Sequence, residues 1–414
     1  MLSFVEVLLC VVGAVVLLPG VVLLVEALAA LAGVPGEAES GQAAGPRVAV
    51  LVPAHDESSG IVQTVRALIE QLPPNGRVVV VADNCTDDTA VLAAQAGATV
   101  LERHDPTRIG KGFAISFGLD HLAEAPPDIV ILVDADCRIS RGGLSTLARL
   151  ATSTGRPVQA EYLLTVPANP GPMATVGALA ILVRNRVRPR GLRRLGFPCQ
   201  LTGSGMAFPW AVLRGAPATG ANLVEDLVMG IELALQGHPP LLCPSVQVGS
   251  ELPEGAAAGL RQRRRWEHGQ LQTLVTYGPR LLAAGLARGR AGLLALGLDL
   301  MVPPLALLVM LEVGWLALTL GLALAGVVPF APAVLAAAGL ALVGAAVAVA
   351  WAGFGRQIIR ARQLVFVPLY LLWKIPLYLA LAVRGGQKKW ERTARKGEST
   401  EPPESTKPTD RAVG

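Results

Sequence analysis

The stretch Ile-Val-Ile-Leu-Val-Asp-Ala-Asp (residues 129–136) decides the fold of this 414-residue chain. Its first five residues are apolar and mostly β-branched, which predicts a short strand buried on both faces. Asp134 and Asp136 follow directly, and the strand period of two turns both carboxylates to the same side. Two carboxylates at a strand end suit a hard divalent cation such as Mg²⁺ or Mn²⁺, which usually also binds substrate phosphates. A solvated turn is the alternative.

Similar apolar runs come earlier in the chain, at residues 48–52, 78–82 and 99–101. Helix-like stretches separate them, ending near residues 72, 96 and 122. Short buried runs that alternate with helices predict a parallel sheet covered on both faces. In such sheets ligands bind at the carboxyl ends of the strands.

Polar motifs begin where these runs stop. Pro53, His55 and Glu57 follow the first run, and Asp83 follows the second. We therefore expect these residues and Asp134 to share one site. The Asp83 carboxylate can accept hydrogen bonds from a base or a ribose, and the alternative is that it caps the next helix.

Two further motifs supply a cation and a pair of acids. Lys111 lies between two glycines, which let the backbone approach a phosphate while the lysine adds positive charge. A solvated lysine is the alternative. Glu225 and Asp226 open a helix-like stretch that runs to residue 236. Acids at a helix start often only stabilise the helix dipole, but a carboxylate beside a sugar hydroxyl can act as a general base.

A basic segment at residues 261–270 precedes the second apolar region. Some of its arginines can simply lie on the lipid surface. Arginine also binds diphosphate in a bidentate manner, and tryptophan offers a flat face to a sugar ring. Gln262, Arg265 and Trp266 are therefore candidate binding residues.

Apolar segments flank the polar region at both ends. Residues 4–33 exceed the roughly 20 residues that a spanning helix needs, which predicts a retained anchor whose Glu26 either lies near an interface or faces protein. Residues 291–328 and 331–355 are also long enough. Residues 364–383 mix aromatics with a lysine, which is typical of an interfacial or re-entrant segment.

Basic clusters at residues 261–290, 356–362 and 384–396 set the orientation. The positive-inside tendency puts all three in the cytoplasm. This predicts three spans and one interfacial segment in the plasma membrane, with an extracellular N-terminus and a cytoplasmic polar region. A hairpin within 291–328 is the alternative. The predicted parts are an anchor (1–35), a catalytic domain (47–255), an interfacial region (256–290), a membrane region (291–384) and a disordered tail (397–414).

Composition narrows the class of protein. The net charge is only +5 and aromatics make up 4% of the chain, without the basic and aromatic interleaving that binds nucleic acid, so no nucleic-acid partner is expected. The five cysteines are scattered and form no Cys-x-x-Cys pair. They indicate neither a zinc site nor a disulfide framework, and they fit a reducing cytoplasm.

The ordered motifs resemble those of the family 2 glycosyltransferases. The likeness is to the membrane-embedded, processive branch that includes cellulose, chitin, hyaluronan and poly-N-acetylglucosamine synthases, and it runs from Arg47 to the end of the membrane region. It implies an α/β GT-A (Rossmann-like) fold between N- and C-terminal transmembrane helices. It also implies a hexosyltransferase that uses a nucleotide-sugar, a UDP-sugar in particular, with Mg²⁺ or Mn²⁺ as cofactor.

The resemblance assigns roles to individual residues. The nucleotide-sugar would contact or lie near Pro53, His55, Glu57, Asp83, Lys111 and Asp134. The metal would bind Asp136 and Asp134. The acceptor would be bordered by Gly203, Ser204 and Gly205. Asp226, next to Glu225, would be the base of an inverting transfer. The Gln-x-x-Arg-Trp motif associated with polymer synthesis would be Gln262, Arg265 and Trp266.

The chain departs from the family pattern in places. Asp56 stands where many members have Asn, and Asn84 where many have a second Asp. Few membrane segments are present, so a closed polymer channel would need a homo-oligomer or an export partner. A growing polysaccharide or glycan is the first predicted acceptor, and a lipid or lipid-linked acceptor that receives one sugar is the second. A non-catalytic nucleotide-binding membrane subunit is the third hypothesis, against which the joint presence of Asp134, Asp136 and Asp226 argues.

Overall fold

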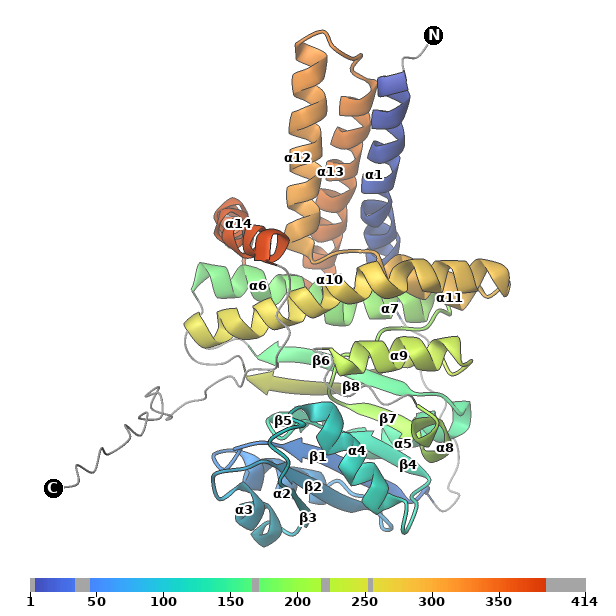
Figure 1. Ribbon diagram of the computed structural model, residues 1–414, viewed down its shortest axis with the longest axis vertical. Helices are drawn as coiled ribbons and strands as arrows, with labels where there is room; N and C mark the ends of the chain where they lie inside the picture. The colour runs from blue at the N-terminus through green and yellow to red at the C-terminus, as the bar shows by residue number, and fades with distance from the viewer. Residues whose placement is uncertain (1–3, 34–44, 166–170, 217–223, 252–255, 385–414) are drawn as a thin grey trace, which may run out of the picture.

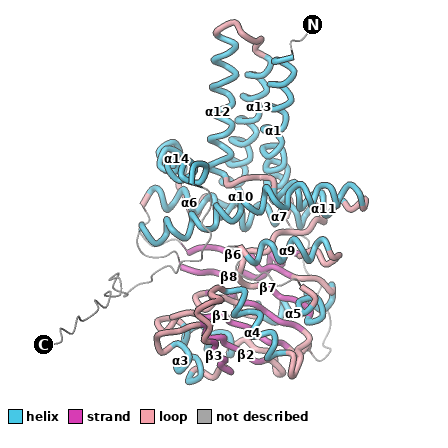
Figure 2. The backbone as a smooth tube through the Cα atoms, in the orientation of Figure 1, coloured by secondary structure: helices cyan, strands magenta, loops and turns pink. Residues whose placement is uncertain are grey.

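The computed structural model describes residues 4–33, 45–165, 171–216, 224–251 and 256–384, without the side chains of residues 251–263 and 381–384. A lower α/β body carries an upright group of helices, and a layer of helices lies across the space between them (Figure 1). The strands are confined to the lower body (Figure 2). Among the described residues, four helical segments are long and apolar enough to cross a membrane.

The lower body is built on one mixed sheet of eight strands with the order β3-β2-β1-β4-β7-β6-β8-β5. The strands are β1 (Val48–Ala54), β2 (Arg77–Asp83), β3 (Thr99–Arg103), β4 (Ile129–Leu132), β5 (Cys137–Ile139), β6 (Val158–Thr165), β7 (Met206–Pro209) and β8 (Leu241–Glu251). The first four strands pair in parallel, as the apolar runs predicted. The later strands make the sheet mixed, because β7 runs antiparallel to β4 and β6, and β5 runs antiparallel to β8.

Helices cover both faces of this sheet. One face carries α2 (Ile61–Ile69), α3 (Thr89–Gln95) and α5 (Gly143–Thr154), and the other carries α4 (Lys111–Leu122), α8 (Trp210–Arg214) and α9 (Glu225–Leu235). Alternate residues of β1 enter the two cores: Val50 packs with the first group of helices and Leu51 with the second. Each such side chain contributes about 1.5–3 kcal/mol through burial. Because these strands are buried on both faces, their sequences are continuous runs of apolar residues.

The middle layer consists of helices that lie across the base of the upright helices (Figure 1). They are α6 (Pro172–Leu182), the π-helical turn η1 (Val183–Val187), α7 (Arg188–Arg194), α10 (Ala256–Ala287) and α11 (Ala291–Leu300). The helix α11 corrects the prediction of one apolar region over 291–328, because it packs on α10 and ends before Pro303 and Pro304. Proline lacks the amide hydrogen that a continuing helix requires.

The upright helices are α1 (Phe4–Leu31), α12 (Leu305–Leu324) and α13 (Ala331–Ala350), and each contacts the other two. Small residues permit close packing: a Cβ at Gly20 would lie 3.1 Å from Val343 Cγ2. The chain then passes through η2 (Trp351–Gly355) and η3 (Ala361–Phe366) into α14 (Val367–Arg384). The helix α14 lies beside the base of this group and across its direction, which favours the predicted interfacial segment (Figure 1).

A buried ionic cluster joins the upright helices to the middle layer. Arg188 of α7 donates to Glu26 of α1 through Nε (3.2 Å) and to Asp299 of α11 through Nη2 (2.6 Å). All three side chains are at most 6% exposed. Gly191 lies one turn further along α7, and a Cβ there would come within 2.1 Å of the Glu26 carbonyl oxygen. Glu26 therefore faces protein, the second of the two placements predicted for it.

Replacing Arg188 with alanine should lower the stability of the whole protein. Two buried carboxylates would lose their common counter-ion, and breaking a buried pair in this way costs about 3–5 kcal/mol. Thermal unfolding in detergent would measure the loss. Arg47→Ala is the matched control, because Arg47 pairs with Asp128 at the exposed surface, and its melting temperature should stay close to that of the unaltered protein. Equal melting temperatures for the two variants would contradict this account.

Candidate functional site

The centre of the site is a lysine beside an aspartate at the carboxyl end of β4. Lys111 is the first residue of α4, and its Nζ lies 2.5 Å from Asp134 Oδ1 and donates to the Gly203 carbonyl oxygen (2.6 Å). The preceding Gly110 has φ of 142°, which brings the helix start close to the strand end. The structure therefore brings together Lys111, Asp134 and Gly203, which are far apart in the sequence.

The Gly203–Gly205 loop is held against the sheet by buried hydrogen bonds. Ser204 Oγ accepts from the Asp134 amide (3.1 Å), and the Ser204 carbonyl accepts from Gln159 (2.9 Å). Gln159 also accepts from the Thr202 amide (2.8 Å). Ser204 is fully buried, so its role here is to position Asp134. Sequence reasoning did not identify Gln159, because an isolated glutamine in a strand gives no local signal.

Asp226 faces this loop from the start of α9. A Cβ at Gly203 would lie 3.1 Å from Asp226 Oδ2 and 3.8 Å from Lys111 Nζ, so only glycine leaves the space between them open. Gly203 also has φ of 97°, a conformation that glycine adopts without strain. Asp226 and Lys111 thus approach the same small space.

The charges in this space are strongly coupled. Burial opposes the charge on Lys111, but Asp134, Glu225 and Asp226 outweigh it and raise the pKa of Lys111 above its ordinary value. Burial raises the pKa of Asp134, and Lys111 opposes that rise. Burial also raises the pKa of Glu225 to about 7, against the effect of Lys111 and with the help of Asp226. One cation therefore supports three carboxyl groups.

The residues at the end of β4 fit a hard divalent cation. Ligand atoms of Asp134, Asp136 and Cys137 lie within 4.8 Å of one another. Carboxylate oxygens are the ligands that Mg²⁺ and Mn²⁺ prefer. Burial raises the pKa of Cys137 well above its ordinary value, and sulfur is a soft ligand that does not match such an ion. Asp134 would have to share its carboxylate between the cation and Lys111.

A second group of predicted residues lies at the ends of β1 and β2. His55 Nδ1 donates to the Asp83 carbonyl (2.7 Å), which joins the two strand ends. The Asp83 carboxylate is buried and pairs with Arg103 (2.5 Å), which ends β3. Arg103 also pairs with Asp105 (3.3 Å). Sequence reasoning missed Arg103 and Asp105, because it did not consider the residues after the third strand.

Asp56 and Asn84, where the chain departs from the family pattern, stabilise the loops after β1 and β2. Asp56 and Asn84 have φ of 49° and 52°, in the left-handed region that Asp and Asn tolerate better than most residues. The Asp56 carboxylate accepts from the Thr86 amide (2.6 Å), and the Asn84 side chain accepts from the Asp105 amide (2.7 Å). Both side chains thus hold the loops that follow the strands.

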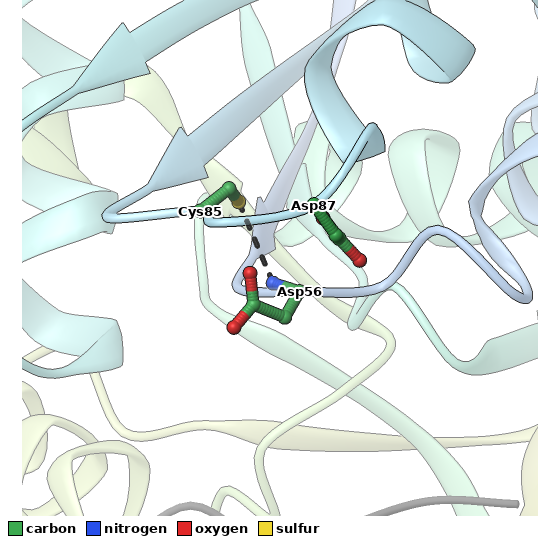
Figure 3. Close-up of side chains that lie close together, drawn as sticks. All are labelled: Asp56, Cys85 and Asp87. Atoms are coloured by element: carbon green, nitrogen blue, oxygen red, sulfur yellow. Dashed lines mark hydrogen bonds between the residues drawn. The ribbon is translucent and has the colours of Figure 1, made fainter. Parts of the chain in front are cut away.

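Asp56, Cys85 and Asp87 also cluster closely (Figure 3). The Asp56 amide donates to Cys85 Sγ (3.4 Å), as the dashed line shows. Burial raises the pKa of Cys85 to about 11, so the thiol is neutral. Hydrogen bonds from Thr89 and Ser58 outweigh the burial of Asp87 and lower its pKa to about 2. Protein donors already occupy these groups, and they do not fit a metal site. Glu57 lies in the same loop, where its amide donates to Thr89 Oγ1 (2.7 Å).

The predicted Gln-x-x-Arg-Trp residues lie on α10, on the membrane side of the site. The side chain of Gln262 lies outside the described residues. Trp266 lines a cavity together with Arg184 of η1, and Arg184 interacts electrostatically with Asp226. The Arg265 Nε is buried, and no described group accepts a hydrogen bond from it. Pro53 lies half-buried near the end of β1.

Comparison with known proteins supports this interpretation. The family described as glycosyltransferase like family 2 matches residues 46–269. An uncharacterised glycosyltransferase of Mycobacterium tuberculosis is 30% identical over 226 residues, which cover 46% of this chain and 96% of that relative. A low-salt glycan biosynthesis hexosyltransferase of Haloferax volcanii is 33% identical over 111 residues, which cover 26% of this chain and 25% of that relative.

Solved structures are more distant. A mannosyltransferase of Pyrobaculum calidifontis in complex with GDP-Man and Mn²⁺ is 20% identical, with a TM-score of 0.48, over 82% of this chain and 98% of that chain. Because the family model covers more than half of the sequence, the chain belongs to the family 2 glycosyltransferases. It is a glycosyltransferase with the GT-A fold and with helices of membrane-spanning length towards both termini.

The raised pKa of Glu225 predicts how stability depends on pH. The folded state holds this proton up to about pH 7, whereas the unfolded state releases it near the ordinary value of 4.5. Stability should therefore fall as the pH rises from about 4.5 to 7 and then stay level. Glu225→Gln should remove this fall and make the protein more stable than the unaltered chain at pH 8.

Thermal unfolding in metal-free buffer between pH 5 and 8 would measure the effect. Glu124→Gln is the control, because Glu124 is exposed in the turn after α4, and this variant should keep the original pH dependence. A Glu225→Gln variant that is less stable than the unaltered protein at pH 8 would show that the carboxylate is charged and stabilising.

Proposed function

We propose that the chain transfers a sugar with inversion from a UDP-sugar to an acceptor presented at the cytoplasmic face of the plasma membrane. One observation carries the proposal: Asp226 and Lys111 approach the same space beside Gly203, next to Asp134. Family membership supplies the reaction class, and this arrangement supplies a base and a cation for it. A non-catalytic subunit would have no use for the two together.

The donor would lie along the carboxyl ends of β1, β2 and β4. Pro53, His55, Glu57 and Asp83 would border the nucleoside. Lys111 and Asp136 would lie at the diphosphate. Asp134 and Asp136 would hold a divalent cation, which would neutralise charge on the leaving diphosphate. The fixed hydrogen bonds of Ser204 and Gln159 support this arrangement, because they hold the Asp134 backbone in one position.

The residues of the chain would act as follows. The acceptor hydroxyl oxygen attacks the anomeric carbon, and the bond from that carbon to the diphosphate oxygen breaks. Asp226 takes the hydroxyl proton, and the nucleoside diphosphate leaves with the electron pair. Lys111 stabilises the negative charge that develops, and it needs no rearrangement because Asp134 and the Gly203 carbonyl already hold it. Gly203 leaves room for the acceptor beside Asp226.

Two acceptor classes are compatible with this site. The Gln-x-x-Arg-Trp residues favour a growing polysaccharide. The packing of the membrane helices favours single addition to a lipid or lipid-linked acceptor, because α1, α12 and α13 each contact the other two. We give the second class more weight. A polymer product would need an export partner or further copies of the chain.

The arrangement of the helices supports the proposed orientation. The N-terminal end of α1 lies at the far end of the upright helices from the catalytic body (Figure 1). The basic residues after α13, including Arg356 and Arg360, follow a helix that returns to the base. Three crossings with a cytoplasmic catalytic body satisfy both observations.

Asp226→Asn should lower sugar transfer by about 10²–10⁴-fold, because the amide cannot take the acceptor proton. The assay is nucleoside diphosphate release from a panel of UDP-sugars by membranes that contain the protein, with product size read in parallel. Asp120→Asn is the control, because Asp120 is an exposed acid on the outer side of α4. One short product would mean single addition, and a ladder would mean polymerisation. Release from no donor, or undiminished release by Asp226→Asn, would contradict the proposal.

Asp136→Asn should weaken the response to metal. The variant loses a carboxylate that is proposed to bind the cation, so the concentration of Mn²⁺ that gives half-maximal transfer should rise about tenfold or more. Titration of EDTA-treated protein with Mn²⁺ and with Mg²⁺ would measure this. Asp56→Asn is the matched control from the cluster that does not fit a metal, and its metal response should not change. If Asp56→Asn raised the half-maximal Mn²⁺ concentration more than Asp136→Asn, the metal would bind at Asp56, Cys85 and Asp87, and the proposed metal site would be wrong.

A further inference from the structure

A cavity lies between the middle layer and the base of the upright helices. Its volume is about 70 Å³, and it opens to solvent. Its apolar wall is formed by Leu23 of α1, Ile181 of α6 and residues 302–306 at the start of α12. The cavity therefore adjoins helices of membrane-spanning length on one side.

The polar wall of the cavity carries charged side chains, of which Arg184 makes no direct ion pair with a described residue. Arg188 and Glu267 both line it, but Arg188 pairs with Glu26 and Asp299, and Glu267 pairs with Lys374. Arg184 lines the same wall, and among the described residues no hydrogen bond or ion pair is made to it. Burial lowers the pKa of Arg184 from its ordinary value. Asp226, Asp299 and Glu267 attract the Arg184 guanidinium without bonding to it directly, so its hydrogen-bond donors are available to an anionic group in the cavity.

Arg184 also connects the cavity with the reaction centre. It lies on the π-helical turn η1, and its guanidinium interacts electrostatically with Asp226. Trp266 and Tyr370 line the cavity from α10 and α14. A π-helical turn inside a helix is a local distortion that occurs often at functional sites. An anion at Arg184 would thus lie between the membrane and the proposed base.

We infer that the cavity binds the phosphodiester of a hydroxyl-bearing phospholipid, with Arg184 on the phosphate and the lipid hydroxyl directed to Asp226. The inference rests on the proposed transferase function and names the acceptor class. The lipid hydroxyl oxygen bonds to the anomeric carbon, its proton passes to Asp226, and the nucleoside diphosphate leaves. The apolar wall accommodates the start of the acyl chains, which a soluble phosphate ester does not have.

The test uses the full-length protein in phosphatidylcholine nanodiscs with the donor that supports turnover. The discs contain either phosphatidylglycerol or diacylglycerol of the same chains, and soluble glycerol 3-phosphate is a third probe. Phosphatidylglycerol should raise nucleoside diphosphate release about tenfold and carry the sugar into the lipid extract. Diacylglycerol, which lacks the phosphate, and glycerol 3-phosphate, which lacks the chains, should do neither.

Arg184→Gln should raise the half-saturating concentration of phosphatidylglycerol about tenfold or more, because a charge-assisted hydrogen bond to phosphate is lost. Arg184→Lys should restore part of the affinity, and Arg66→Gln on the exposed side of α2 should match the unaltered protein. Melting temperatures would show that each variant is folded.

Equal stimulation by diacylglycerol, or an unchanged lipid response in Arg184→Gln, would overturn the inference. Sugar transfer to a soluble glycan alone would also overturn it and leave the transferase proposal intact. No donor turnover with any acceptor would overturn the transferase proposal itself.

Discussion

Arg188, buried between Glu26 and Asp299, is the interaction on which the relation between membrane helices and catalytic body depends. A guanidinium can bridge two carboxylates with fixed geometry, which a single ammonium point charge cannot do as well. The Arg188 bridge joins α1, α7 and α11. Gln200, which lies three residues before Gly203 in the sequence, donates a hydrogen bond to the same Asp299. The loop beside Asp226 is thereby tied to the membrane anchor. A transferase that acts on a lipid acceptor needs its reaction centre at a fixed distance from the membrane surface.

In the reaction centre, as in the Arg188 cluster, one buried cation interacts with several carboxyl groups. Lys111 is shared by Asp134, Glu225 and Asp226, so one buried cation makes several buried acids tolerable. The arrangement is sensitive to its surroundings: Glu225 stays partly protonated near neutral pH, while Lys111 remains charged. A donor diphosphate and a divalent cation would enter as a further pair of opposite charges. The site therefore suits a ligand that combines a negatively charged diphosphate with a positively charged metal ion.

The cavity beneath α1 and α12 has the opposite character, because most of its wall is apolar. Catalytic charges and membrane-facing apolar surface meet at Arg184 and Trp266. The basic segment of α10 therefore lies beside this cavity, where its Trp266 forms part of the wall. The helix α14 completes the wall, since its Lys374 pairs with Glu267 next to Trp266.

The sequence by itself determined the first four parallel strands, the motifs at their ends and the presence of apolar segments on both sides of the catalytic body, because these depend on local periodicity and on residue type. It also predicted that Asp134 and Asp226 belong to one site, through the resemblance of their motifs. Only the tertiary structure decided that β7 and β5 run antiparallel, that Arg103 pairs with Asp83, and that Arg184 lines the cavity without a direct ion pair to any described residue. Those features depend on which distant segments meet, and neither periodicity nor spacing along the chain reports the pairing of buried charges.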